Sequence, residues 1–140
     1  MNNRTTFIGL LALCSATLYA EEAGHRPMNI LLIMADDFGY ECLSANGSDT
    51  YSTPNIDRLA NRGIRFNRCY SNPLSTPSRV QLMTGKYNVR NYVAFGQLDR
   101  KEVTFGNLLQ KKGYATCIAG KWQLGKELDS PQHFGFEQSC

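Results

Sequence analysis

The stretch MNILLIMADD at residues 28–37 decides the fold that the sequence predicts. Apart from Asn29, its first seven residues form an apolar run rather than an alternating pattern, which is typical of a parallel strand buried on both faces. Asp36 and Asp37 come soon after this run, so the strand would deliver two carboxylates to its carboxyl end, where open α/β sheets bind their ligands. Carboxylate oxygens suit hard divalent cations, and we therefore expect a metal site at this edge.

A second informative stretch is STPSRVQLMTGK, residues 75–86. Pro77 fits only the first turn of a helix, so the helix should begin at about Ser75 or Thr76. Ser75 would then lie where free backbone N–H groups and the helix dipole attract a phosphate or sulfate. Arg79 is four residues further on and can reach the same anion. Taken alone, the pattern also fits Ser75 as a helix cap and Arg79 as a solvated surface charge.

The other segments extend an alternation of strands and helices. We expect helices near residues 55–62, 75–84 and 105–112, strands near residues 64–70 and 114–120, and a loop at residues 87–100. Such alternation indicates a parallel sheet covered by helices on both faces. The run KWQLG at residues 121–125 follows the last strand, so Lys121 would add a cation at the edge that carries Asp36.

Composition places few limits on function. The chain has 140 residues, a net charge of +3 and 42% hydrophobic residues, and it lacks the basic runs that would indicate nucleic-acid binding. His25 and His133 are too isolated to indicate zinc. Some of the cysteines could pair in an oxidising compartment, but Cys69 and Cys117 fall in expected strands, where we predict buried thiols instead.

Four segments in this order resemble the sulfatase family of the alkaline phosphatase superfamily. They are NILLIMADD at 29–37, TPNIDRLA at 53–60, STPSR at 75–79 with Thr84 and Gly85, and GKWQLG at 120–125. The resemblance runs from about Met28 to the end of the chain. It implies an α/β, alkaline-phosphatase-like sandwich of a mostly parallel sheet with helices on both faces, of which only the amino-terminal part would be present.

The resemblance also implies residue roles. Asp36, Asp37 and Ser75 would bind calcium. Ser75 would be oxidised by a maturation enzyme to formylglycine, whose hydrated aldehyde attacks the sulfur of a sulfate ester and later releases sulfate by re-forming the carbonyl. Arg79 would hold the aldehyde hydrate, and Lys121 would bind the sulfate oxygens.

Two positions depart from the commoner family pattern. Many members carry cysteine where this chain has Ser75. A serine at this position resembles the substrates of anaerobic radical-type maturases, so such a maturase would be a required partner. Gln123 stands where the commoner run has histidine. Glutamine can position a group through hydrogen bonds but cannot transfer a proton near neutral pH, so a catalytic role for Gln123 is limited to positioning. The alternative is an inactive member.

The amino end resembles a secretory signal peptide over residues 1–20. Arg4 precedes the apolar residues 7–13, and Ala20 offers a cleavage site before Glu21. This segment is too short to span a membrane as a helix. We therefore expect export to the periplasm or the extracellular space, with residues 21–140 forming the amino-terminal part of a catalytic domain.

Three function classes remain open at this point. The first is a piece of an exported sulfatase that acts on a sulfated carbohydrate or an aryl sulfate. The second is a phosphoester or phosphonate hydrolase of the same superfamily, and the third is a non-catalytic scaffold in which Ser75 is never modified. A whole sulfatase is several times longer, and its further metal ligands and leaving-group histidine have no counterpart here. We therefore expect the chain alone to be truncated and inactive.

Overall fold

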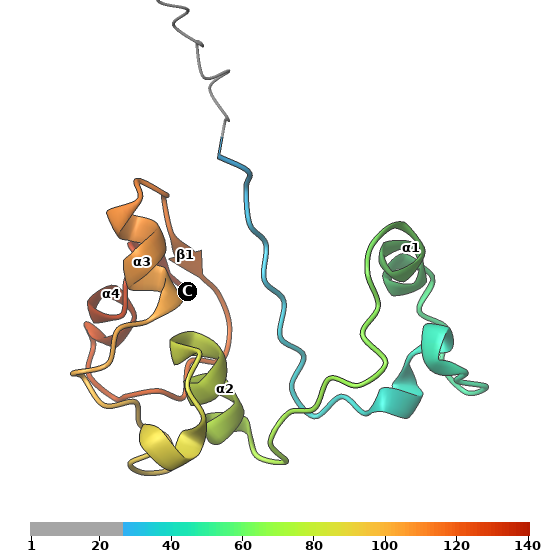
Figure 1. Cartoon of the computed structure of the whole chain (residues 1–140), viewed down its shortest axis with the longest axis horizontal. Helices are drawn as coiled ribbons and strands as arrows, with labels where there is room; N and C mark the ends of the chain where they lie inside the picture. Colours follow the sequence, from blue (N-terminus) through green and yellow to red (C-terminus); the bar gives the residue numbers. More distant parts are fainter. Residues whose placement is uncertain (1–26) are drawn as a thin grey trace, which may run out of the picture. The chain divides into compact units, whose positions relative to one another are not determined.

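The computed structural model describes residues 27–140, which fall into a short unit that ends at Met34 and a compact unit, Ala35–Cys140. The helices of the compact unit are α1 (Pro54–Arg62), α2 (Ser75–Thr84), α3 (Phe105–Lys111) and α4 (Ser130–His133), as Figure 1 shows. Short 3-10 turns are η1 (Tyr40–Cys42), η2 (Ser44–Asn46) and η3 (Asn88–Arg90). The two strands are β1 (Cys117–Ile118) and β2 (Gln138–Ser139).

Strands β1 and β2 form a small parallel sheet. Cys117 lies opposite Gln138, and Ile118 lies opposite Ser139. The backbone pairing continues beyond the strands, because Gly120 N donates to Cys140 O at 2.8 Å. Strand β1 is thus a short central part of the strand expected at residues 114–120, and the residues after it form the loop that carries Lys121.

The three expected helices are confirmed, because their end signals are local. Helix α2 begins at Ser75 and ends at Gly85, which adopts the left-handed conformation (φ 65°) that terminates helices. Helix α3 begins with a capping box, in which Thr104 and Asn107 each accept a hydrogen bond from the backbone N–H of the other. The expected loop at residues 87–100 is also present, with η3 inside it.

A small hydrophobic core supports the segments around α2. Its buried members are Val80, Met83, Leu98, Leu124, Phe134 and Phe136. Trp122 packs against this core with ring centroids 6.0 Å from those of Phe134 and Phe136, and its indole N–H donates to Ser130 Oγ at 2.9 Å. The core therefore fixes both the helix that carries Arg79 and the loop that carries Lys121.

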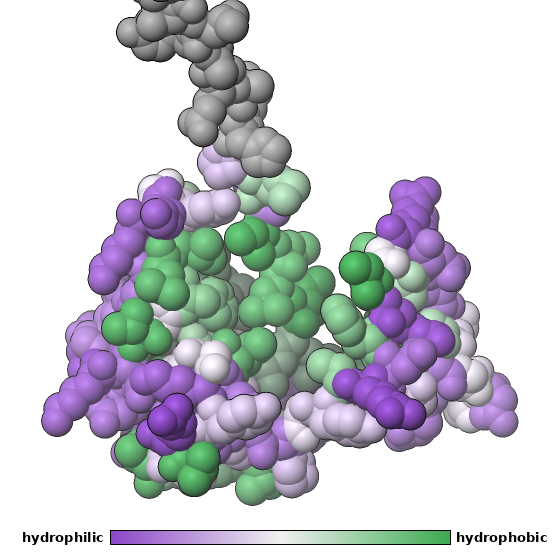
Figure 2. All heavy atoms as spheres, in the orientation of Figure 1, coloured by the Kyte–Doolittle hydropathy of each residue, from purple (hydrophilic) through white to green (hydrophobic). Residues whose placement is uncertain are grey.

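Two expected strands, residues 28–34 and 64–70, are not strands in the structure. Ile33 and Phe66 are exposed to 74% and 73%, and Figure 2 shows mainly hydrophobic spheres along residues 28–34. A buried strand needs hydrogen-bonded neighbours and a covering layer, and neither segment has a paired neighbour among residues 27–140.

The prediction of buried thiols is also wrong. Cys69 and Cys117 are both exposed, because Cys69 lies in one of the unformed strands and β1 is too short to be covered.

The expected signal peptide at residues 1–20 and His25 lie outside the described residues. Within residues 27–140, none of the helices has both the length and the apolar character that crossing a membrane requires.

Candidate active site

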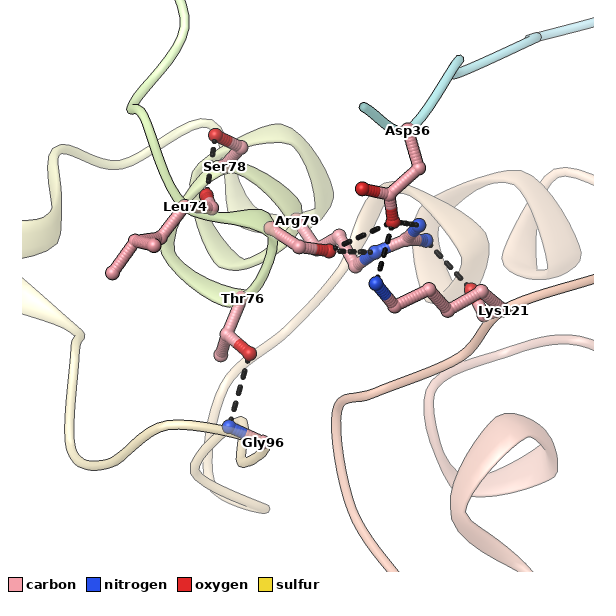
Figure 3. A network of polar contacts seen from close by, with 8 residues as sticks. Asp36, Leu74, Thr76, Ser78, Arg79, Gly96 and Lys121 are labelled. Atoms are coloured by element: carbon pink, nitrogen blue, oxygen red, sulfur yellow. Dashed lines mark hydrogen bonds and ion pairs between the residues drawn. The ribbon is translucent and has the colours of Figure 1, made fainter. Parts of the chain in front are cut away.

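Side chains from three separate segments of the compact unit meet at the carboxylate of Asp36 (Figure 3). Asp36 Oδ2 accepts from Ser75 Oγ at 3.1 Å and from Arg79 Nη2 at 2.9 Å. The same oxygen forms an ion pair with Lys121 Nζ at 2.7 Å. The structure thus brings together four of the residues that the sequence singled out.

Arg79 connects all three segments. Its Nε donates to Ser75 Oγ at 2.9 Å, its Nη2 to Asp36, and its Nη1 to the backbone oxygen of Lys121 at 2.6 Å. The side chain is only 12% exposed. The forked guanidinium therefore sets the positions of the hydroxyl, the carboxylate and the lysine loop relative to one another.

The interpretation of Ser75 as a helix cap is wrong. Leu74 is the N-cap residue, with extended backbone and no side-chain cap hydrogen bond, and Ser75 is the first helical residue. The amino end of α2 therefore has no side-chain cap among the described residues, which leaves its N–H groups able to bind an anion. Arg79 is not a solvated surface charge either, because its three hydrogen bonds lie inside the cluster.

Residues that the sequence analysis missed hold the chain on both sides of Ser75. Asn72 donates to Gln81 Oε1 and to Asn88 Oδ1, each at 2.8 Å, which ties the preceding loop to α2 and η3. Thr76 is fully buried, and its hydroxyl accepts from Gly96 N at 3.0 Å, as Figure 3 shows. Asn72 lies in a loop and Thr76 in the first turn of α2, and no periodic pattern marks either residue in the sequence.

The loop after Lys121 is anchored at Trp122 and at Leu124, and its backbone is strained between them. Leu124 is buried, and its carbonyl accepts from Leu98 N at 3.1 Å. Between these anchors Gln123 has a left-handed backbone (φ 53°), which non-glycine residues rarely adopt. Its buried Oε1 has no hydrogen-bond partner within residues 27–140, and no hydrogen bond among them links Gln123 to the Asp36 cluster.

Asp36 and Asp37 differ in their surroundings. Asp37 has a left-handed backbone (φ 52°), and no hydrogen bond or ion pair engages its carboxylate within the described part of the chain. Asp36 Oδ1 is equally free of protein donors there. The free carboxylate oxygens of these two aspartates, and the Ser75 hydroxyl that bonds to Asp36, are oxygens of the kind that Ca²⁺ binds. Calcium takes about six to eight oxygens, so these residues could supply part of a site. No cluster of three or more His, Cys, Asp or Glu side chains occurs within residues 27–140.

The cations around Asp36 keep its carboxylate charged. The hydrogen bond from Lys121, followed by that from Arg79, lowers the pKa of Asp36 from 3.8 to about 2, while partial burial opposes this shift. Asp36 is therefore an anion throughout the neutral range, as a metal ligand must be.

The TPNIDRLA segment has a different role, and none of its hydrogen bonds or ion pairs within residues 27–140 involves this cluster. Thr53 Oγ1 accepts from Ser44 N at 3.0 Å, and Asp57 Oδ1 accepts from Ala45 N at 2.9 Å. These bonds tie η2 to the first turn of α1. The segment therefore builds a local turn.

Comparison with known proteins decides the family. The sulfatase family model matches residues 28–140. The chain belongs to the sulfatase family. Human steryl-sulfatase is 41% identical over 135 residues, which cover 81% of this chain and 23% of that protein. N-acetylglucosamine-6-O-sulfatase of Bacteroides thetaiotaomicron is 39% identical over 130 residues, which cover 91% of this chain and 23% of that protein.

Solved structures support the same assignment. The crystal structure of Ps i-CgsB matches with a TM-score of 0.72 and 34% identity over 76% of this chain and 26% of that one. The structure of Ps i-CgsB in complex with k-i-k-neocarrahexaose matches with a TM-score of 0.70, 34% identity, and coverage of 74% and 25%. These matches confirm the alkaline-phosphatase-like α/β fold class. The chain spans about a quarter of the length of these relatives.

Proposed function

We propose that this chain supplies the nucleophile side of the active site of a sulfuric ester hydrolase, with Ser75 as the precursor of the nucleophile. The observation that carries the proposal is the position of Ser75 Oγ, which lies 2.9 Å from Arg79 Nε and 3.1 Å from Asp36 Oδ2. A hydroxyl held between a guanidinium and a carboxylate, at the amino end of a helix, is oriented for attack on an anionic ester. Membership of the sulfatase family supports sulfur as the atom attacked.

Each residue of the cluster has a task that follows from its chemistry. Arg79 fixes the orientation of the oxygen on residue 75 through the hydrogen bond from its Nε. Lys121 is half-exposed and long enough to bind a sulfate oxygen. The backbone N–H groups at the start of α2 lower the energy of the bound anion. Gln123 would position a neighbouring group without changing its own charge.

Two groups complete the proposed site. Oxidation of Ser75 to formylglycine by an anaerobic serine-type maturase would supply a geminal diol, one hydroxyl of which is the nucleophile while the other allows sulfate to leave. Asp36, Asp37 and the oxygen of residue 75 would hold calcium, which supplies Lewis-acid stabilisation of negative charge on oxygen. The two aspartates and the hydroxyl are hard oxygen donors, which supports this assignment.

The proposed substrates are sulfated carbohydrates or aryl sulfates. The names of the relatives support both, since they include human arylsulfatase A and an N-acetylglucosamine-6-O-sulfatase, and one structural match is a complex with a neocarrahexaose. We also propose that residues 1–20 direct export to the periplasm or the extracellular space, and that residues 21–140 are the amino-terminal part of the catalytic domain.

The experiment compares esters and maturation states. The whole protein that carries this chain is produced with and without a serine-type maturase, and the peptide that spans Ser75 is weighed and treated with a hydrazide. We expect matured protein to have lost H₂ from residue 75, to react with the hydrazide and to hydrolyse sulfate esters. Ser75→Ala should show neither the aldehyde nor turnover. Preferential hydrolysis of phosphate esters would favour the phosphoester hydrolase. Protein in which Ser75 stays unmodified despite the maturase, and which hydrolyses neither ester, would favour the scaffold.

A further inference from the structure

The contacts of Asp36 are concentrated on one oxygen. The side chains of Ser75, Arg79 and Lys121 all bind Oδ2, whereas Oδ1 accepts no hydrogen bond within residues 27–140. Lys121 Nζ makes the shortest of these contacts, at 2.7 Å. An ammonium group therefore occupies the immediate surroundings of a carboxylate to which the proposed function assigns a divalent cation, and the inference below rests on that proposed function.

A divalent cation and the Lys121 ammonium would compete for this carboxylate. Calcium binds carboxylate oxygen at about 2.4 Å. With Lys121 Nζ at 2.7 Å from Oδ2, a cation on the same oxygen would be at most about 5 Å from the ammonium. Repulsion between positive charges at that distance disfavours simultaneous binding in a partly buried cluster. A metal that binds Oδ2, alone or together with Oδ1, therefore requires one of the cationic side chains to weaken its contact with that oxygen.

Lys121 is the side chain that can move. Arg79 is 12% exposed and would lose bonds to Ser75 and to the Lys121 backbone if its guanidinium turned away. The Lys121 side chain is 49% exposed, and its ammonium has Asp36 as its single acidic partner among the described residues. Its backbone is fixed by Arg79 and by the neighbouring Trp122, so the movement is limited to the flexible stem.

We propose that Lys121 couples metal binding to anion binding. Without metal, its ammonium neutralises Asp36. When Ca²⁺ binds to Asp36, the ammonium is displaced from Oδ2 and becomes available to a sulfate group. By the reciprocity of linked equilibria, a sulfate that binds Lys121 removes a competitor from Asp36 and raises its affinity for Ca²⁺.

The test measures Ca²⁺ affinity by calorimetry on the whole matured protein, in sodium sulfate and in sodium chloride of equal ionic strength, with free Ca²⁺ read by an electrode. We expect sulfate to lower the Kd for Ca²⁺ by about fivefold or more, which is the lower end of typical coupling between sites. In Lys121→Met the effect of sulfate should disappear. The Kd of this variant without sulfate should be no weaker than that of the unchanged protein, because the competing cation is gone.

Lys86→Met is the matched control. Lys86 is also about half-exposed and pairs with one carboxylate, Glu102, so its loss changes the net charge equally without touching Asp36. This variant should retain the full effect of sulfate. The proposal is overturned if sulfate leaves the Kd of the unchanged protein constant, if the coupling persists in Lys121→Met, or if Lys121→Met weakens Ca²⁺ binding severalfold in chloride. If the unchanged matured protein hydrolyses sulfate esters but sulfate does not alter its Kd for Ca²⁺, this inference alone is overturned. If that protein neither hydrolyses sulfate esters nor binds Ca²⁺, the proposed function is overturned as well.

Discussion

Helices α1 and α2 both begin within a proline-containing motif, but different forces hold them. Helix α2 buries Thr76, Ser78, Val80 and Met83 and carries Arg79 into the cluster around Asp36. Helix α1 has no buried residue, and its start is held by local hydrogen bonds that backbone N–H groups of η2 donate to the side chains of Thr53 and Asp57. A motif match therefore does not by itself mark an active site, because one of these motifs builds the candidate site and the other builds a turn.

The largest expected difference between the helices follows from replacing an arginine in each. Arg79→Gln removes the charged hydrogen bonds that connect Asp36, Ser75 and Lys121. We expect this change to lower the free energy of unfolding of the whole protein by roughly 2–4 kcal/mol and to abolish turnover. Arg62→Gln, on the exposed end of α1, should stay within about 0.5 kcal/mol. Denaturant titration measures both, and equal effects would remove the distinction between the helices.

The next largest difference concerns packing. Val80 of α2 is fully buried in the core, so Val80→Ala should cost about 2 kcal/mol of unfolding free energy. Leu59 of α1 is 69% exposed, and Leu59→Ala should cost little. Thermal unfolding followed by circular dichroism provides the comparison. A cost at Leu59 as large as that at Val80 would show that a further part of the protein covers α1.

A smaller, local effect is expected at α1. Asp57→Ala removes the acceptor for Ala45 N and for the Thr53 hydroxyl, which should destabilise the η2 turn by about 1 kcal/mol. Hydrogen exchange at the amide of Ala45 should then speed up about fivefold, while sulfate-ester turnover stays unchanged. A large loss of turnover in this variant would mean that the TPNIDRLA segment contributes to the site after all.

The smallest effect is a dependence of stability on pH. Because the pKa of Asp36 falls from 3.8 to about 2 on folding, its charged contacts stabilise the metal-free protein above pH 3.8 and are lost as the pH falls toward 2. Carboxyl NMR signals should therefore show Asp36 titrating below the ordinary range. In Lys121→Met the pKa of Asp36 should rise, since Lys121 makes the largest contribution to the shift. An unchanged pKa in that variant would contradict the ion pair.

The sequence predicted the parts of the fold whose causes are local. Pro77 and Gly85 fixed the limits of α2, and the capping residues Thr104 and Asn107 mark the start of α3. The strands at residues 28–34 and 64–70 depend on partners distant in sequence, and an apolar run cannot show whether those partners are present. The same limit explains Cys69 and Cys117, whose burial would require a complete sheet.

The sequence predicted the residues of the candidate site that carry a charge or a nucleophilic hydroxyl, but not the residues that hold them in place. Asp36, Ser75, Arg79 and Lys121 are recognisable because each has a chemical reason to lie near an anion or a metal. The contacts of Asn72 and Thr76 depend on loops that meet only in the folded chain. The strain at Gln123 could not be seen either, because only the three-dimensional path of the loop sets its backbone angles.

The most direct test of the central claim, that Ser75 is the precursor of a sulfatase nucleophile, relates turnover to modification. Preparations of the whole protein with graded extents of maturation are assayed on one sulfate ester, and the aldehyde fraction at residue 75 is measured by mass spectrometry in each. Turnover should rise in proportion to the aldehyde fraction and extrapolate to zero at zero modification. Turnover that persists undiminished in protein whose residue 75 is entirely unmodified serine would contradict the formylglycine mechanism and favour a direct serine nucleophile.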